Sequence, residues 1–190
     1  MRSGVGSARE RLLGAASRLF YAGGVTATGI DAITAEAGVA KMSLYNNFSS
    51  KDDLVLAYIE ARHEEWLELY RRRAAPAATA MDAVMAVFDA YIDHASAAYL
   101  HGFRGCGLLN AAAELPVGAP GRDAVRRHKE EVEEILAEHL AGIVSPTEAQ
   151  KMAEHLTFLL EGAMSRAGLE GQPDRLKRAK AMARGLVRTL

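Results

Sequence analysis

Residues 28–51 constrain the fold of this 190-residue chain more than any other stretch, because they predict two short helices joined by a tight turn. Ile30, Ile33 and Ala37 recur at helical spacing on one face of the first helix. Gly38 is placed to end that helix, since glycine readily adopts the left-handed conformation that a sharp stop requires.

The second helix of this stretch is expected from about Lys41 to Phe48, with Leu44 turned inward, and Thr28 is expected to cap the first helix. Its outer face carries side chains that can hydrogen-bond outward, namely Lys41, Ser43, Tyr45, Asn46 and Asn47. This layout is typical of a helix-turn-helix, whose second helix enters the major groove of DNA. The same spacing also fits an ordinary surface hairpin of helices, so the flanking sequence has to decide.

The flanks supply the helices that such a motif needs for a compact core. Ser7 is a plausible N-cap for a first helix with an apolar stripe that ends at Gly23-Gly24. Ser50, with Asp53 at capping-box spacing, begins a long helix to about Arg73. We therefore expect three small helices packed together, followed by a helix long enough to continue into the rest of the chain.

Composition favours helix throughout. Apolar residues make up 49% of the chain but aromatic residues only 6%, and no alternating β-branched run is present, so we predict an all-α protein.

The net charge is −1, yet residues 1–51 hold six basic and three acidic side chains, which suits DNA binding by this part alone. No apolar stretch reaches membrane-spanning length and no signal peptide is evident, so we expect a cytoplasmic protein with no membrane partner.

The remaining sequence predicts a helical body. Helices are expected over residues 80–100, 108–115, 122–143, 146–167 and 174–190. The run Ser145-Pro146-Thr147-Glu148 is a strong start signal, because it combines a capping residue, proline at the first position and glutamate three after the serine. We divide the chain into a flexible leader (1–7), a helix-turn-helix domain (8–53, motif about 29–48) and a helical body (54–190).

Residues 8 to about 60 resemble the TetR family of bacterial transcriptional repressors. The resemblance rests on the combination of the helix-turn-helix with a Leu-Tyr-x-x-Phe run and a lysine at the next helix start. The residues that carry it are Ala16, Leu19, Phe20, Gly24, Thr28, Ile30, Ile33, Ala37, Gly38, Val39, Leu44, Tyr45, Phe48, Ser50 and Lys51.

The resemblance implies a double-stranded DNA operator as partner and assigns roles position by position. Thr28 and Lys51 are expected to meet phosphates, and Tyr45 and Asn47 the DNA backbone. Lys41, Met42 and Ser43 open the recognition helix toward the base edges, with Asn46 at its exposed tip. Lysine and tyrosine suit phosphates, whereas asparagine can pair with adenine through two hydrogen bonds. Met42 and the Asn46-Asn47 pair depart from the family pattern, so the operator sequence cannot be predicted.

The family also implies a homodimer and a small-molecule effector. The helices at about 148–167 and 174–190 are expected to form the dimer interface, although their apolar stripes would equally serve as intramolecular core. The body should enclose a cavity for a mostly apolar effector. Candidate lining residues, each of which is also a plausible core residue, are Trp66, Phe88, Tyr91, Ile92, Tyr99, Phe103, Leu109, Asn110, Leu136 and Phe158.

Three features leave alternatives open. Asn110 and Glu114 are polar in an apolar short helix, so they either point into the cavity or pair locally. Cys106 is the single cysteine of the sequence, so no intrachain disulfide can form. It is either a buried small residue or a redox sensor. A helical metalloenzyme is the alternative function class, but His128 and His139 are eleven residues apart, too far along one helix to share a metal. We expect no enzyme activity, cofactor or metal; a regulator that responds to a metal or redox signal is a further alternative.

Overall fold

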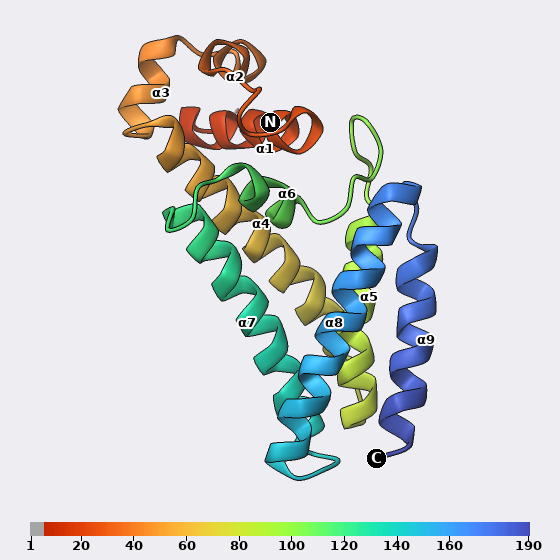
Figure 1. Cartoon of the computed structure of the whole chain (residues 1–190). Helices are drawn as coiled ribbons and strands as arrows, with labels where there is room; N and C mark the ends of the chain where they lie inside the picture. The colour runs from red at the N-terminus through yellow and green to blue at the C-terminus, as the bar shows by residue number, and fades with distance from the viewer. Residues whose placement is uncertain (1–5) are drawn as a thin grey trace, which may run out of the picture. The chain divides into compact units, whose positions relative to one another are not determined.

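A computed structural model of the chain describes residues 6–190, which form α-helices and contain no strand. The all-α prediction is therefore confirmed. Most of the expected leader, residues 1–5, lies outside the described residues. Among the described helices, none is long and apolar enough to span a membrane. The helices labelled in Figure 1 are α1 (Ala8–Gly23), α2 (Ile30–Ala37), α3 (Lys41–Asn47), α4 (Lys51–Ala74), α5 (Ala80–Ala95), α6 (Gly107–Glu114), α7 (Pro120–Leu140), α8 (Pro146–Glu170) and α9 (Asp174–Arg188).

Helix α1 begins as predicted, with Ser7 as its N-cap. The Ser7 hydroxyl accepts a hydrogen bond from the Glu10 amide at 3.2 Å, and the Glu10 carboxylate accepts one from the Ser7 amide at 2.7 Å. This reciprocal pair is a capping box, which satisfies two of the amide groups that a helix start leaves open. The helix ends at Gly24, where φ is 92°.

The turn between α2 and α3 depends on Gly38, which adopts the left-handed conformation with φ 62° and ψ 42°. There the Gly38 amide donates to the Ala35 carbonyl and the Val39 amide donates to the Thr34 carbonyl, each at 3.1 Å. These bonds satisfy carbonyls at the end of α2 and let the chain reverse within a few residues. The predicted glycine turn is confirmed.

Thr28 does not cap α2, and that prediction is wrong. The N-cap of α2 is Gly29, which has no side chain to make the bond. The buried Thr28 hydroxyl instead donates to the Gly24 carbonyl at 2.6 Å. Because the Thr28 hydroxyl is bonded to a carbonyl at the C-terminal end of α1, it is not available to cap the start of α2.

Helix α4 starts with a variant of the predicted capping box. The Asp53 amide donates to the Ser50 hydroxyl at 3.1 Å, as the spacing indicates. The Asp53 carboxylate, however, accepts from the amide of Ser49 at 2.9 Å rather than from that of Ser50. An aspartate side chain is one methylene shorter than the usual glutamate, and here it closes the box one residue earlier.

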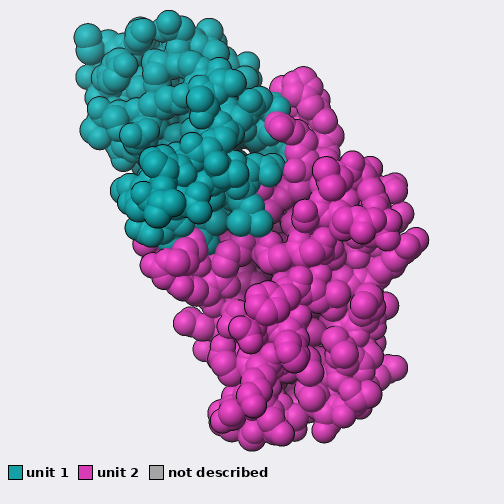
Figure 2. Space-filling view, viewed as in Figure 1, with its two compact units in different colours: residues 1–62, 107–125 teal, residues 63–106, 126–190 magenta. Residues whose placement is uncertain are grey.

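The chain forms two compact units, coloured separately in Figure 2. Unit 1 comprises Met1–Arg62 and Gly107–Val125, and unit 2 comprises His63–Cys106 and Arg126–Leu190. The division differs from the boundary at residue 53 that the sequence suggested. Helix α6 was assigned to the body, but it packs on α1 within unit 1.

In unit 2, α8 and α9 lie side by side as a helical hairpin against α5 (Figure 1). Their facing sides are almost entirely apolar, which buries a continuous core. The predicted start of α8 is confirmed, because Ser145 and Glu148 form a capping box with proline in the first turn. Core residues of the three helices include Val84, Val87, Phe88, Leu156, Leu160, Met164, Leu176, Ala183 and Val187.

Helix α5 ends at Ala95, five residues before the predicted end. The hydroxyl of Ser96 donates to the Ile92 carbonyl at 2.7 Å, and the hydroxyl of Tyr99 donates to the His94 carbonyl at 2.9 Å. These side chains satisfy carbonyls that a longer helix would have bonded through its own backbone, and so they favour an earlier stop.

Candidate functional site

Helix α3 presents one polar face to solvent because its opposite face is anchored in the core of unit 1. Leu44 is 0% exposed and Phe48 is 2% exposed, while Met42 on the outer face is 69% exposed. The guanidinium carbon of Arg9 on α1 lies 4.9 Å from the Phe48 ring centroid, a cation–π contact at the end of α3. A seven-residue helix is too short to be stable alone, so this anchoring is what orders it.

The outer face consists of side chains that can reach a ligand surface. Lys41, Met42, Tyr45 and Asn46 are exposed, and Ser43 and Asn47 are half-buried. The Lys41 ammonium pairs with the Asp31 carboxylate of α2 at 2.8 Å, and this hydrogen bond raises the pKa of Lys41. An exposed ion pair of this kind is weak, so Lys41 remains available to a phosphate.

Three predicted DNA contacts already make hydrogen bonds within the protein. The Asn47 side-chain amide donates to the Ser43 carbonyl at 2.7 Å, which holds it along the helix. The Thr28 side chain is buried, whereas Lys51 at the start of α4 is half-buried and donates to the Thr26 carbonyl at 3.4 Å. The face offered outward by unit 1 is therefore formed chiefly by the first and middle turns of α3.

Glu114 of α6 holds the loop between α1 and α2. Its two carboxylate oxygens accept hydrogen bonds from the amides of Val25 at 3.0 Å and Thr26 at 2.7 Å. Desolvation by itself would raise the pKa of Glu114, but the hydrogen bonds from these backbone amides outweigh it and lower the pKa. Gly24 allows the close approach, since a Cβ there would meet a Glu114 oxygen at 2.7 Å.

Sequence reasoning singled out Glu114 but offered only a cavity or a local partner for it. Its partners lie 88 and 89 residues away in the chain, which no local spacing can indicate. Arg18 of α1 pairs in the same unit with Glu36 of α2 at 2.9 Å, another contact that the sequence pattern did not reveal. Together these contacts brace the helices that position α3.

The predicted effector residues do not all belong to one unit. Leu109 and Asn110 are exposed residues of α6 in unit 1, and Phe158 is an exposed residue of α8 in unit 2. The others belong to unit 2, where Ile92 and Tyr99 are half-buried. The buried members of the set are Trp66, Phe88, Tyr91, Phe103 and Leu136.

Trp66 lies at the centre of an aromatic and histidine cluster in unit 2. Its ring stacks on Tyr70 with centroids 5.7 Å apart and lies 5.4 Å from the rings of both Tyr91 and His128. His128 Nδ1 lies 2.9 Å from Nδ1 of His63, and burial lowers the pKa of His128 to about 2. The buried imidazole is therefore neutral at physiological pH.

Beside this cluster lies a partly buried ion pair that sequence reasoning missed. The Lys129 ammonium of α7 contacts the Glu161 carboxylate of α8 at 2.6 Å and lies 3.7 Å from the Cys106 sulfur. Burial alone would lower the pKa of Lys129, but Cys106, Tyr91 and Glu161 outweigh it and raise that pKa. The ammonium therefore stays charged. The sequence analysis selected neither residue, because the two positions lie on different helices, 32 residues apart.

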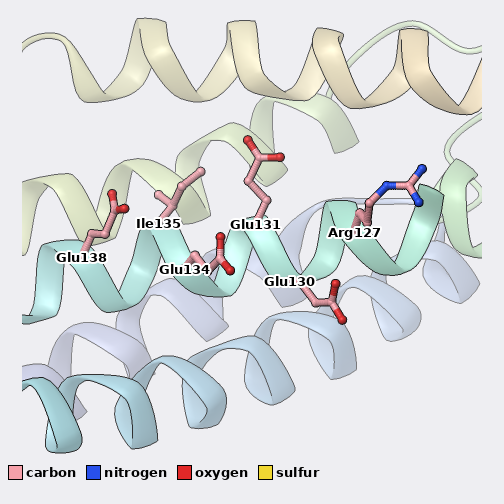
Figure 3. A pocket seen from close by; sticks show the side chains of 6 residues that line it. All are labelled: Arg127, Glu130, Glu131, Glu134, Ile135 and Glu138. Atoms are coloured by element: carbon pink, nitrogen blue, oxygen red, sulfur yellow. The ribbon is translucent and has the colours of Figure 1, made fainter. Parts of the chain in front are cut away.

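A surface hollow of about 510 Å³ runs along α7, lined by the six side chains drawn in Figure 3. Ile135 is its one apolar lining residue, and none of the predicted effector residues lines it. Its chemistry does not match an apolar effector. Within the described part of the chain, no group of three or more histidine, cysteine, aspartate or glutamate residues is arranged to hold a metal ion. The other lining residues are Arg127, Glu130, Glu131, Glu134 and Glu138.

Comparison with known proteins agrees with this geometry. The family model described as "Bacterial regulatory proteins, tetR family" matches residues 12–58, and that described as "Tetracyclin repressor-like, C-terminal domain" matches residues 80–183. A crystal structure of a TetR-family transcriptional regulator from Streptomyces coelicolor is 35% identical, with a TM-score of 0.86, over 96% of this chain and 95% of that one. A TetR regulator from Chloroflexus aurantiacus is 26% identical, with a TM-score of 0.82, over 95% and 94% of the two chains.

A curated relative, the HTH-type transcriptional activator FasR of Mycolicibacterium smegmatis, is 42% identical over 96 residues. That match covers 48% of this chain and 43% of the relative, so the chain spans less than half of the relative's length. The two family models and the full-length structural match show that the chain belongs to the TetR family of bacterial regulatory proteins. It is a DNA-binding transcriptional regulator with a helix-turn-helix domain, and not an enzyme.

Proposed function

We propose that the protein is a cytoplasmic, homodimeric repressor that binds a palindromic operator and releases it when a small, mostly apolar effector binds the body. The observation that carries the DNA part is α3, with a polar exposed face and an anchored apolar one. Lys41, Met42 and Ser43 face the base edges in this proposal, and Asn46 lies at the tip. Tyr45, Asn47, Thr28 and Lys51 are assigned to the DNA backbone.

A dimer is proposed because one short helix reads only a few base pairs. Exposed apolar residues on α8 and α9 support it. Phe158 is 66% exposed on α8, and Gly162 leaves open space beside it for a close approach. Met182 and Leu186 are exposed one turn apart on α9. Exposed apolar patches of this kind commonly mark protein interfaces. Phe158 therefore fits the dimer face better than an effector cavity.

The effector part of the proposal rests on the buried aromatic residues of unit 2. Trp66, Phe88, Tyr91, Phe103 and Leu136 form apolar walls of the type found in small-molecule sites. An effector lowers operator affinity only if it binds more tightly to the conformation that binds DNA poorly. Cys106 is buried, so the structure favours its reading as a small core residue over that of a redox sensor.

Activation is the second candidate function, because the relative from Mycolicibacterium smegmatis is named an activator. A transcriptional reporter fused to the operator separates the two. Deletion of this protein raises expression if it represses, and lowers expression if it activates. The DNA-binding surface proposed above is the same in both cases.

Fluorescence anisotropy with the DNA upstream of its own gene tests the binding. Lys41→Ala should weaken binding and reduce the slope of log affinity against log salt by about 1 per recognition helix, because one positive charge that displaces counterions from the DNA is lost. Lys177→Ala is the matched control, since the two lysine side chains are 57% and 58% exposed. Salt-insensitive binding, or equal effects of the two substitutions, would contradict the proposal.

A further inference from the structure

Unit 2 buries three side-chain polar atoms that make no hydrogen bond to any described residue: Trp66 Nε1, Tyr91 Oη and Glu161 Oε2. Tyr91 is 2% exposed and Trp66 is 5% exposed, whereas the Glu161 side chain is 31% exposed and only its Oε2 atom is buried. A buried polar atom without a partner costs about 1–3 kcal/mol, and native proteins contain few of them. Three in one unit therefore require an explanation.

The three side chains that carry these atoms belong to one contiguous cluster with Lys129. The rings of Trp66 and Tyr91 lie 5.4 Å apart. Lys129 connects Tyr91 to Glu161, since its ammonium lies over the Tyr91 ring, 5.5 Å from the centroid, and contacts Glu161 Oε1 at 2.6 Å. One carboxylate oxygen of Glu161 is thus paired while the other is not. The contributing helices are α4, α5, α7 and α8, which all supply these residues to unit 2.

The charge of the cluster selects the ligand. Lys129 and Glu161 neutralise each other, and Tyr91 and the indole of Trp66 are neutral. A ligand carboxylate would lie against Glu161, and a ligand ammonium would compete with Lys129, so either charge would be left without a full partner in a buried setting. The site therefore favours a neutral ligand.

The hydrogen-bonding capacity selects the functional group. Trp66 Nε1 can only donate, Glu161 Oε2 can only accept while ionised, and the Tyr91 hydroxyl can do both. A ligand hydroxyl is the smallest group that accepts from the indole or the phenol and also donates to the carboxylate. The rings of Trp66 and Tyr91 and the neighbouring stacked Tyr70 supply apolar area for the rest of the molecule.

We propose that Trp66, Tyr91 and Glu161 form a polar subsite for a neutral, mostly apolar effector that carries a hydroxyl group, with Lys129 as the residue that positions Glu161. The proposal rests on the effector-binding function proposed above and specifies its ligand class. It adds to the predicted effector residues two that sequence reasoning did not select, Lys129 and Glu161.

Phenol and toluene are suitable probes, because they have the same number of heavy atoms and differ in the hydroxyl. Benzoate and benzylammonium are the charged counterparts. Calorimetric titration gives each affinity, and the emission of Trp66, the one tryptophan of the chain, reports binding at the site. We expect phenol to bind about tenfold or more tightly than the other three, since tenfold corresponds to about 1.4 kcal/mol, a typical hydrogen-bond contribution.

Tyr91→Phe and Glu161→Gln should reduce the preference for phenol over toluene toward unity. Glu68→Gln, an exposed glutamate of α4, is the control for Glu161 and should leave the preference unchanged. Tyr70→Phe is the contrast for Tyr91, because the Tyr70 hydroxyl lies 2.6 Å from His139 Nε2. It should lower thermal stability more than Tyr91→Phe, since the Tyr91 hydroxyl makes no hydrogen bond of normal geometry in the described part of the chain, although it lies near the Lys129 ammonium.

Equal affinities for phenol and toluene, an unchanged preference in Tyr91→Phe, or no saturable change in Trp66 emission would each overturn the proposal. A crystal structure in which ordered water alone bonds all three atoms at saturating phenol would also overturn it. Operator binding measured with and without phenol tests the ligand response separately from binding at the subsite. Phenol bound at the subsite without any effect on DNA affinity would leave the subsite standing and remove the ligand response.

Discussion

Units 1 and 2 differ in the side chains that they offer to other molecules. Unit 1 buries Leu44 and Phe48 and turns the polar face of α3 outward. Unit 2 contains the partly buried Lys129–Glu161 ion pair and the unpartnered Tyr91 hydroxyl, and it exposes Phe158 on α8. The difference fits the proposed division of roles, in which unit 1 binds DNA and unit 2 binds the effector and a second copy of the chain.

Leu44→Ala should give the largest effect and tests whether unit 1 depends on its own core. Leu44 is fully buried under a helix of only seven residues, so the truncation should lower the free energy of unfolding by about 2–5 kcal/mol. Denaturant titration measures the change. Met42→Ala on the opposite face should change stability by less than about 0.5 kcal/mol. Similar losses in both variants would show that α3 is not anchored as described.

Phe158→Glu tests whether unit 2 is completed by a second copy. In the proposed dimer the carboxylate would be buried, so the dimer dissociation constant should rise by about a hundredfold, equivalent to about 2.7 kcal/mol. Analytical ultracentrifugation measures the dimer constant. Val117→Glu is the control, because Val117 is 91% exposed in unit 1. An unchanged dimer in Phe158→Glu would place the interface elsewhere.

A pH titration of stability tests the buried polar cluster. The pKa of His128 is about 2 in the folded chain and near its usual value, about 6.5, in the unfolded chain. Between these values the unfolded state binds the proton and the folded state does not, so stability falls as the pH drops below about 6.5. The loss from this one group approaches about 1.4 kcal/mol per pH unit.

His128→Gln removes that titration. The stability difference between wild type and variant should therefore shrink steadily as the pH falls from 6.5 to 5, measured by denaturant titration at each pH. The slopes of the free energy of unfolding against pH are compared, so a pH-independent loss of stability caused by the glutamine does not affect the result. Parallel curves over this range would mean that His128 is protonated in the folded state, against the neutral buried imidazole described here.

Glu114→Ala should give the smallest effect and tests how α6 contributes to unit 1. The substitution leaves the amides of Val25 and Thr26 without their acceptor. We expect a loss of about 1 kcal/mol, at the lower end for charged hydrogen bonds because the carboxylate is exposed to solvent. Hydrogen exchange of these two amides should speed up selectively. Exchange that is unchanged would show that the bonds do not persist in solution.

Local patterns predicted the helices well because caps and periodicity act over a few residues. The N-cap at Ser7, the capping box at Ser145, the left-handed Gly38 and the buried Leu44 followed from local sequence alone. The predictions for the end of α5 and for the cap of α2 were wrong, because Ser96 and Thr28 donate hydrogen bonds to carbonyls four residues earlier in the chain. Such side-chain choices are nearly balanced in energy, and periodicity does not rank them.

The proposed DNA contacts could be selected from the sequence because most of them lie within one short helix, α3, and the other two, Thr28 and Lys51, flank the same motif. The proposed effector subsite could not be assembled in the same way. Trp66, Tyr91, Lys129 and Glu161 come from four helices, and a charged residue at a half-exposed helical position reads as solvent-facing. The roles of both sets remain predictions for the experiments above.

Residues 28–51 thus specify a helix-turn-helix through interactions between near neighbours, whose energies depend on the identities of residues three or four positions apart. Tertiary packing decided where Glu114 binds, that α6 belongs to unit 1, and that Lys129 and Glu161 form a partly buried ion pair in unit 2. Those contacts join positions 32 to 89 residues apart. Their free energy is gained only after the helices have assembled, so no local pattern in the chain records them.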